Sequence, residues 1–164
     1  MPDVRNAVAA DLPALTAIYN HYVERTPITF DVVTVQPEQR RQWFDDHGGG
    51  RHVLLVAEEH AAIVGYASTS RWRPKPAYDT TVESSVYVRH DAVGRGIGRA
   101  LYAALFEAIA AEDVHAVVAG VALPNDASVA LHERFGFQQV GVFREVGLKF
   151  GRFWDVAWFQ RRAR

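Results

Sequence analysis

The stretch VGRGIGRALY (Val93–Tyr102) has the residue types and spacing of an anion-binding turn. Three glycines alternate with other residues directly before an apolar helical pattern, and Arg95 and Arg99 stand among them. The first amides of a helix and its positive dipole end favour an anion, and glycine lets the backbone approach one closely. A tight turn in which the glycines merely permit positive φ is the alternative explanation.

The spacing of the glycines argues against two common phosphate ligands. A mononucleotide loop needs four residues between its glycines and then Gly-Lys-Ser/Thr, which is absent. A dinucleotide fingerprint needs G-x-G-x-x-G, and Gly94, Gly96 and Gly98 are one residue short of it. No clear acidic ribose-binding residue follows about 20 positions later. ATP and NAD therefore both fit poorly.

Hydrophobic periodicity places this turn within one α/β domain, residues 1–164, around a mixed sheet. The proline-containing segment RWRPKPAYD is expected to be an exposed loop without regular structure. Helices are expected from Asp11, over PEQRRQWFDDH, after the glycine turn with a core-facing stripe of Ile97, Leu101, Leu105 and Ile109, and from Asn125 to about Phe135. Strands are expected at 28–33, 53–59, 62–69, 81–88 and 115–122, and in the aromatic-rich QVGVFREV and RFWDVAWFQ.

The composition is that of an ordinary globular domain. Hydrophobic residues make up 49% and the formal net charge is -1, so nothing favours nucleic acid or an anionic membrane as a partner. The chain has no cysteine, which excludes disulfides and a cysteine nucleophile. The histidines lack metal-ligand spacing, so no metal is expected. The G-x-S-x-G elbow of serine hydrolases is absent as well, which argues against that class of enzyme. Without a membrane-length apolar run or a secretory signal, a cytoplasmic protein is expected.

A second motif, LPNDASVALHERFGF (Leu123–Phe137), is an Asn followed by a short helix that ends in Gly-Phe. Together the two motifs resemble the GNAT superfamily of acyl-CoA-dependent N-acyltransferases. The diphosphate loop of that family has Gln or Arg, then x-x-Gly-x-Gly or Ala. With Gly96 and Gly98 as its glycines, the first position is Val93, a departure that Arg95 or Arg99 would offset. A register shifted to Arg95–Ala100 fits the letters but agrees less well with the strand-to-helix distance.

The resemblance extends from about Val4 to Gln160 and narrows to phosphinothricin N-acetyltransferases and related methionine sulfoximine and sulfone acetyltransferases. NHYVERTPITF, TVESSVYV and REVGLKFGRFWDVAWFQ are segments that carry it. It implies a GNAT-type α/β fold, a mixed, mostly antiparallel central sheet flanked by helices in a single domain. It also implies acetyl-CoA as co-substrate, a small-molecule amino-acid substrate and a homodimer.

Acetylation of an amine needs a base for the ammonium group and a proton for the departing thiolate. The resemblance assigns the base role to Glu83, which shares a strand face with Ser85 and Tyr87; partial burial would raise its pKa. The family residue that protonates the thiolate, commonly Tyr, is replaced here by His132, which titrates near neutrality. An ion-paired strand Glu and a helix His without a role are the competing interpretations. Without cysteine, direct transfer in a ternary complex is expected.

The resemblance also implies that CoA lies along the strand of Glu83. The pantetheine amides would pair with the backbone of Val86, Tyr87 and Val88, and one of these N–H groups would polarise the thioester. Asn125 would hold the pantetheine arm, and Arg134 would assist at a CoA phosphate. The residues expected to bind the diphosphate are Gly94, Arg95, Gly96, Ile97, Gly98 and Arg99.

An amino-acid acceptor carries a carboxylate, which Arg can bind with two hydrogen bonds. Basic residues cluster in RWRPK, just before the strand of Glu83, and Lys149 is a further candidate, although a hairpin lysine more often faces solvent. Phe30 and Tyr78 could wall the pocket, but aromatic side chains more often serve packing. The carboxylate-binding candidates in the cluster are Arg71, Arg73 and Lys75.

Two other functions remain open for the same chain. A GNAT enzyme for a polyamine, a protein N-terminus or an antibiotic amine would favour an acidic acceptor pocket, against which the basic RWRPK segment argues. A non-catalytic CoA-binding module would bind CoA without acetylating any acceptor.

Overall fold

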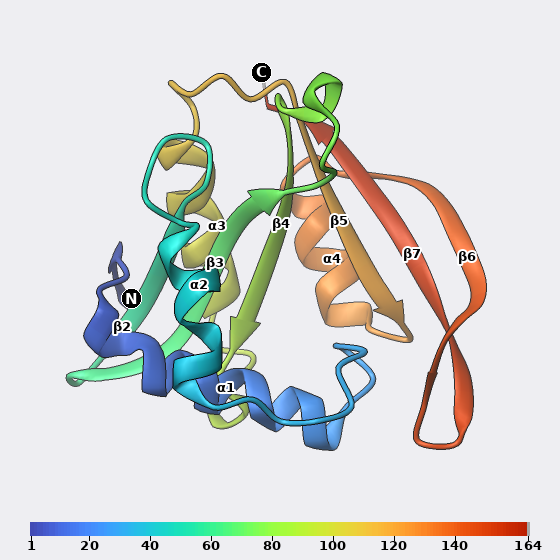
Figure 1. Ribbon diagram of the computed structural model, residues 1–164, viewed down its shortest axis with the longest axis horizontal. Helices are drawn as coiled ribbons and strands as arrows, with labels where there is room; N and C mark the ends of the chain where they lie inside the picture. The colour runs from blue at the N-terminus through green and yellow to red at the C-terminus, as the bar shows by residue number, and fades with distance from the viewer. Residues whose placement is uncertain (164) are drawn as a thin grey trace.

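The computed structural model describes residues 1–163 and is organised around one seven-stranded sheet (Figure 1). The strand order is β1-β2-β3-β4-β5-β7-β6, and every neighbouring pair is antiparallel except the parallel pair β4–β5. The expected mixed, mostly antiparallel sheet is confirmed. The strands are β1 (Asp3–Asn6), β2 (Leu54–Glu59), β3 (Ala62–Arg71), β4 (Thr81–Val88), β5 (Ala116–Leu123), β6 (Gln138–Lys149) and β7 (Arg152–Arg162).

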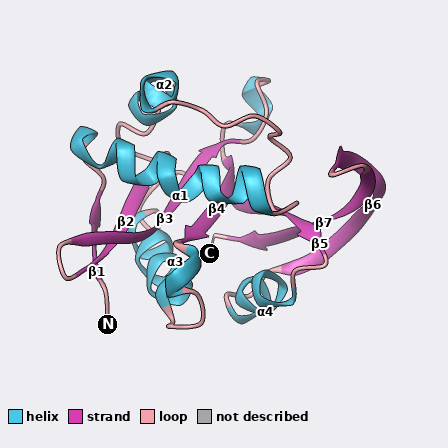
Figure 2. Ribbon diagram, turned by 90° about the horizontal axis from the view of Figure 1, so that it is seen from below, coloured by secondary structure: helices cyan, strands magenta, loops and turns pink. Residues whose placement is uncertain are grey.

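Helices cover both faces of the sheet. Figure 2 shows α1 and α2 on one face and α3 and α4 on the opposite face. None of the helices within residues 1–163 combines the length and apolar character that a bilayer crossing requires. The helices are α1 (Leu12–Arg25), α2 (Arg41–Asp45), α3 (Ile97–Ala108) and α4 (Asp126–Arg134). Short 3-10 turns lie at Ala9–Asp11, Pro37–Arg40, Pro76–Tyr78 and His90–Ala92.

The two faces carry separate apolar clusters, one under each helix layer. The predicted stripe of α3 is confirmed: its members Ile97, Leu101 and Leu105 are at most 1% exposed. On the other face, Leu15 of α1 packs with Tyr66 of β3. Truncating such a buried Leu to Ala costs about 2–5 kcal/mol, so both clusters hold their helices firmly on the sheet.

The sheet divides into a fork between β4 and β5 (Figure 1). β4 pairs with β3 along nearly its whole length, but with β5 only where Thr81–Glu83 lies opposite Ala116–Val118. Beyond Glu83 the two strands diverge, while β5 continues to pair with β7 as far as Leu123. The divergence leaves one edge of β4 without a strand partner in the middle of the sheet.

The predicted strand at 28–33 is wrong, because this segment is an extended loop without a partner in the sheet. Its backbone is held instead by side chains, since Lys149 Nζ donates to the Thr29 carbonyl at 2.8 Å. The Tyr19 hydroxyl also lies 2.8 Å from the Thr29 hydroxyl. Val32 and Val33 are largely exposed, so these β-branched residues do not form the buried face of a strand.

Two other element predictions need correction. The sequence did not predict β1, which pairs with β2 and is too short for a recognisable alternation. Arg71, expected in the loop, is the last residue of β3, and the loop that follows contains a 3-10 turn at Pro76–Tyr78. The remaining expected strands and helices are all present, with their ends shifted by a few residues.

Candidate active site

The open edge of β4 presents backbone amides to the fork. The Arg89 N–H donates to the Val64 carbonyl across the β3–β4 ladder at 2.8 Å. Because hydrogen bonding alternates along an antiparallel pair, odd-numbered residues of β4 bond to β3 and even-numbered residues point away from it. The amides of Val86 and Val88 therefore face the fork, whereas the Tyr87 amide faces β3. The fork can thus accept an extended amide-bearing chain at Val86 and Val88.

A groove of about 550 Å³ continues from this edge to the glycine turn and α4. The groove brings together predicted cofactor-binding residues from distant segments of the chain. They are Val86, Tyr87 and Val88 from β4, Gly94, Gly96, Ile97, Gly98 and Arg99 from the turn and the start of α3, and Asn125 and Arg134 from the two ends of α4. The first hydrogen bond of α3 runs from the Ala100 N–H to the Gly96 carbonyl at 3.0 Å. The preceding amides, those of Ile97, Gly98 and Arg99, have no helical acceptor and point out of the N-terminus.

The three glycines of the turn have different structural roles. Gly94 and Gly96 have φ of +82° and +80°, which favour glycine, and Gly96 is the residue directly before α3. Gly98 lies inside the helix, and a Cβ there would come 3.3 Å from the side chain of Leu131. The third glycine therefore lets α3 approach α4 where both border the groove.

The two arginines of the turn point to different partners. Arg95 forms an ion pair with Glu59 at the end of β2. Arg99 lines the groove, as does Arg134 of α4. Val93, the departure from the family pattern, stands at the groove edge and is 56% exposed. In this arrangement Arg99 is the better placed of the two to offset the missing charge at Val93.

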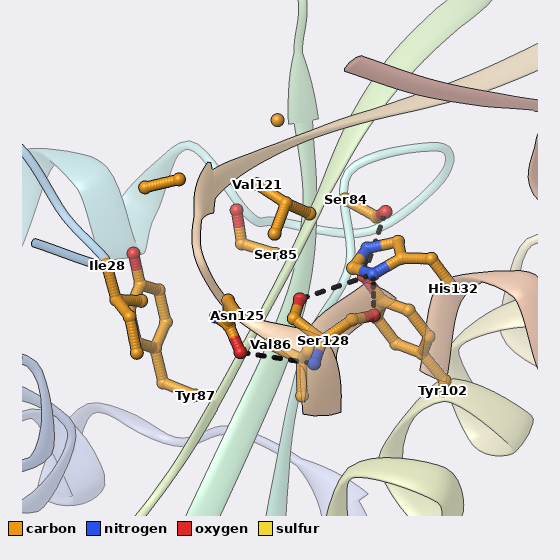
Figure 3. A pocket seen from close by; sticks show the side chains of 12 residues that line it. Ile28, Ser84, Ser85, Val86, Tyr87, Tyr102, Val121, Asn125, Ser128 and His132 are labelled. Carbon is orange, nitrogen blue, oxygen red and sulfur yellow. Dashed lines mark hydrogen bonds between the residues drawn. The ribbon is translucent and has the colours of Figure 1, made fainter. Parts of the chain in front are cut away.

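Asn125 stands where the groove enters the fork. Its side-chain oxygen accepts the Ser128 N–H at 3.2 Å and so caps α4. The residue lines both the groove and a smaller cavity of about 50 Å³ between β4 and β5 (Figure 3). Because the side-chain oxygen is used by the helix, the amide nitrogen is the group left to contact a chain lying in the groove.

A buried chain of hydrogen bonds forms one wall of the fork cavity (Figure 3). The Ser84 hydroxyl lies 3.2 Å from the Tyr102 hydroxyl, which lies 2.9 Å from His132 Nε2. On the other side of the ring, His132 Nδ1 lies 2.7 Å from the Ser128 carbonyl. The chain thus joins β4, α3 and α4 at the point where the sheet opens.

These distances determine which nitrogen of His132 carries the proton. A carbonyl only accepts, so Nδ1 must donate to the Ser128 carbonyl. In the neutral ring Nε2 then accepts the Tyr102 hydroxyl proton. Burial lowers the pKa of His132, and the bond to the Ser128 carbonyl offsets this only in part. The resting form is therefore a neutral imidazole whose contact with the fork runs through Tyr102.

Glu83 lies at the base of the fork, where it is the last residue of β4 that pairs with β5. Its partner across β3 is Ser70, and its side chain projects from the face covered by α1 and α2. Burial raises the pKa of Glu83, and the positive charge of Arg73 partly opposes this. A carboxyl of this kind accepts a proton more readily than an exposed one.

A second cavity, of about 320 Å³, lies on this face between the sheet and α1–α2. Ser70 and Ser85, the neighbours of Glu83 on the sheet, form part of its floor. Ser85 and Tyr87 also line the fork cavity, so the two hollows meet at Ser85 and Tyr87, and Ser85 is two residues from Glu83 on the same face of β4. The complete lining is Tyr19, Asp31, Val35, Arg40, Trp43, Tyr66, Ser68, Ser70, Ser85 and Tyr87.

The basic candidates fall into different environments. Arg71 donates to the carbonyls of Arg73 and Pro74 and pairs with Asp79, which holds the loop together. Arg73 stacks on Trp72, with 5.0 Å from the guanidinium carbon to the ring centroid, and is the cation whose charge acts on Glu83. Arg73 is therefore the better-placed candidate for a carboxylate near the base.

The remaining candidates for the acceptor pocket mostly serve packing in the structure. Lys75 is exposed, and its carbonyl accepts the Tyr78 N–H at 2.9 Å. Tyr78 packs edge-on against Trp72, while Phe30 lies directly against Gly147, where a Cβ would collide with its ring.

Lys149, the further carboxylate-binding candidate, does not face solvent as a hairpin lysine more often does. The residue is only 4% exposed, and its ammonium group donates to the carbonyls of Thr29 and Tyr22 at 2.8 and 3.5 Å. Burial lowers the pKa of Lys149, and the charge of Asp31 partly restores it. Lys149 therefore tethers the loop after α1 to β6.

Four further residues of the site were not predicted. Tyr22 donates to the Val88 carbonyl and Tyr102 contacts His132, but both resemble ordinary apolar positions of amphipathic helices. Ser128 lies one helical turn before His132, a spacing that suggests such a bond. Arg40 offers no sequence signal, because its cavity is built from six separate segments: α1, the loop at 31–35, the 3-10 turn at Pro37–Arg40, α2, β3 and β4.

Comparison with known proteins identifies the family of this chain. The acetyltransferase (GNAT) domain family matches residues 4–158. A phosphinothricin N-acetyltransferase of Streptomyces coelicolor is 56% identical over 161 residues, covering 96% of this chain and 94% of that protein. An L-methionine sulfoximine/L-methionine sulfone acetyltransferase of Pseudomonas aeruginosa is 41% identical over 158 residues, covering 96% and 92%.

A solved structure gives the same result at the level of the fold. The phosphinothricin acetyltransferase of Sinorhizobium meliloti, solved in complex with AcCoA, superimposes with a TM-score of 0.93 at 33% identity. The match covers 98% of this chain and 88% of that one. Sequence, fold and the joined groove and fork agree, and the chain belongs to the GNAT acetyltransferase family.

Proposed function

We propose that this protein transfers the acetyl group of acetyl-CoA directly to the amino group of a small amino-acid-like acceptor. The observation that carries the proposal is that two hollows meet at Ser85 and Tyr87, on the strand face that also carries Glu83. The groove and fork fit an extended cofactor with phosphates at the N-terminus of α3, and the second cavity gives a small acceptor access to the same point.

Different residues of the chain act in different steps of the reaction. Bound acetyl-CoA supplies an activated acetyl thioester. The amides of Val86 and Val88 face the fork and can donate to the cofactor arm or to the thioester oxygen, where one preorganised donor contributes about 3 kcal/mol. Glu83 removes a proton from the acceptor ammonium, directly or through water, because a neutral amine is needed for attack.

In this proposal His132 and Tyr102 return a proton to the departing thiolate. In a protonated His132, Nε2 would donate to the Tyr102 oxygen, and the Tyr102 hydroxyl proton could pass to the sulfur. The Tyr102 oxygen would then take the Nε2 proton, leaving a thiol and a neutral imidazole. Because the pKa of His132 is lowered by burial, solvent competes as the proton source.

The relatives suggest the acceptor class. They are named for phosphinothricin and for methionine sulfoximine and sulfone, all small amino acids with an oxygen-bearing side chain. In this proposal Arg73, whose charge acts on Glu83, binds the α-carboxylate of such an acceptor. The charge that acts on Glu83 is the positive charge of Arg73, which speaks against a polyamine acceptor.

We also propose that the protein is a homodimer. The β6–β7 hairpin extends beyond the body of the domain in Figure 1 and carries apolar side chains in contact with solvent. Monomers seldom expose so many apolar groups together, and a second copy would cover them. Sedimentation velocity is expected to show a dimer that Leu148→Asp converts to monomer; a wild-type monomer would contradict this. The residues, each more than half exposed, are Val140, Phe143, Val146, Leu148, Phe150 and Phe153.

The experiment for the function follows CoA thiol release with acetyl-CoA and a panel of amines. Release with phosphinothricin, methionine sulfone or methionine sulfoximine, together with the N-acetylated product in a mass spectrum, is expected. Release only with polyamines or peptide N-termini would keep the fold and replace the acceptor. A CoA-dependent rise in melting temperature without any turnover would indicate a non-catalytic CoA-binding module.

A further inference from the structure

Arg40 is a cation in the wall of the acceptor-side cavity. Its guanidinium carbon lies 3.9 Å from the ring centroid of Trp43 and 4.7 Å from that of Tyr19. Nη1 donates to the Leu15 carbonyl at 3.2 Å, and Nη2 lies 3.5 Å from the Tyr66 hydroxyl. The aromatic rings fix the plane of the group, and these two contacts use only part of its five N–H donors.

The guanidinium of Arg40 forms no ion pair with a carboxylate in the described part of the chain. Among the ion pairs found within residues 1–163 none involves Arg40, whereas its neighbour Arg41 pairs with Asp45 at 2.9 Å. Asp31 also lines the cavity, but it accepts the Tyr19 hydroxyl and its charge acts on buried Lys149. The cavity therefore has a preoriented guanidinium with donors to spare, and the carboxylate in its lining, that of Asp31, is hydrogen-bonded to Tyr19 and not ion-paired with Arg40.

The floor of the cavity is also polar. Ser68 lies opposite Ser85, and Ser70 lies opposite Glu83, so three hydroxyls adjoin the carboxyl on one face of the sheet. Hydroxyls and a guanidinium together favour oxygen atoms that accept hydrogen bonds. The cavity thus combines a base at one edge with an oxygen-binding wall.

The position of Arg40 separates it from Arg73. Arg40 contacts Tyr66, which is four residues from Ser70 along β3, roughly 13 Å at the rise of a strand. Arg73 acts on Glu83 itself, at the Ser70 end. The α-carboxylate of an amino acid is bonded to the carbon that carries the amine, so it must stay near the amine. A group farther along the side chain is what can reach Arg40.

We propose that Arg40 binds the side-chain oxygens of the acceptor, a phosphinate or a sulfone type of group, while the amine lies at Glu83. This specificity role rests on the proposed acetyltransferase function. It makes the enzyme selective for amino acids that carry strong hydrogen-bond acceptors two or three carbons beyond the α-carbon. Plain aliphatic or thioether side chains would leave the cation without a partner.

The test compares Arg40→Gln, Arg40→Lys and the matched control Arg41→Gln. Steady-state kinetics are measured with phosphinothricin, methionine sulfone and methionine, and calorimetry measures binding of the same three compounds to CoA-saturated protein. Arg40→Gln is expected to lower kcat/KM for the first two compounds roughly 10- to 100-fold, the loss of a charged hydrogen bond, and for methionine less than about 3-fold. Arg40→Lys is expected to recover part of the loss, and Arg41→Gln to behave as wild type.

Two results would overturn the assignment. An equal loss with all three compounds would mean that Arg40 binds the α-carboxylate or only supports the fold, and no loss would mean that it does not contact the acceptor. An unchanged KM for acetyl-CoA in Arg40→Gln is required for the interpretation. If the wild-type protein acetylates none of the compounds, the proposed function fails. If the wild-type protein acetylates these compounds and Arg40→Gln has the same kcat/KM, only the assignment of Arg40 fails.

Discussion

The Tyr102 hydroxyl lies 2.9 Å from Nε2 of His132, and this contact connects the imidazole to the fork. Tyr102 is completely buried on α3, while His132 comes from α4, so the bond joins the two helices that border the cofactor groove. With Nδ1 committed to the Ser128 carbonyl, Tyr102 is the group through which His132 meets the fork.

Replacing Tyr102 by Phe is expected to affect both stability and proton chemistry. The change leaves Nε2 of His132 and the buried Ser84 hydroxyl without their partner, which costs about 1–3 kcal/mol in the free energy of unfolding, measured by urea denaturation. It is expected to lower kcat while the KM for acetyl-CoA changes little. In the wild-type protein ¹⁵N NMR is expected to show His132 protonated at Nδ1; protonation at Nε2 would contradict the hydrogen-bond assignment.

The glycines of the turn are expected to respond differently to alanine. Gly96→Ala strains a backbone with φ of +80°, at a cost of about 1–2 kcal/mol, although nothing lies within 4 Å of the new Cβ. Gly98→Ala has ordinary helical φ but presses on Leu131 at 3.3 Å, which pushes α4 away from α3. Its main effect is therefore expected in the KM for acetyl-CoA, measured by steady-state kinetics. A Gly98→Ala enzyme with wild-type KM would show that the groove tolerates this displacement.

The N-terminal strand is fixed by an ion pair that predicts acid sensitivity. Hydrogen bonds from Arg5 at 2.8 and 3.0 Å lower the pKa of Asp11, and the Val8 N–H contributes further. A lowered folded-state pKa stabilises the protein above the unfolded-state pKa, and this contribution is lost as the pH falls through the folded-state value. Asp11→Asn is expected to cost about 2 kcal/mol at pH 7, with the deficit shrinking below about pH 4.

The matched control for Asp11→Asn is Asp45→Asn, which removes an exposed helical pair with Arg41. This control is expected to cost no more than about 0.5 kcal/mol. A deficit of Asp11→Asn that stayed constant from pH 7 to pH 3 would show that the lowered pKa does not contribute to stability.

Local patterns predicted the elements of this fold well. The four-residue spacing of Ile97, Leu101 and Leu105 predicted a buried face, and the alternation in TVESSVYV predicted that Ser84 and Glu83 project to opposite sides of β4. These features depend only on the geometry of one element. The predicted cofactor residues of the turn and α4 likewise lie in contiguous motifs, and most of them line one groove.

What the sequence could not predict depends on contacts between distant segments. The segment Ile28–Val33 has the composition of a strand, but it pairs with no strand of the sheet, and a side chain from distant β6, that of Lys149, binds its backbone instead. Tyr102 resembles any buried helix aromatic until α4 brings His132 to its hydroxyl. Arg40 becomes notable only because Tyr19, Trp43 and Tyr66 converge on it from three elements. In each case tertiary structure decides the role.

The measurement that tests the central claim most directly is the pH dependence of kcat/KM for Glu83→Gln beside wild type, with Glu107→Gln as an exposed control. Since burial raises the pKa of Glu83, wild-type activity is expected to rise with pH through a value above that of an ordinary glutamate. Glu83→Gln is expected to lower kcat about 10²- to 10⁴-fold and to remove this ionisation from the pH profile, while the KM for acetyl-CoA stays unchanged. Full activity and an unaltered profile in Glu83→Gln would contradict the account.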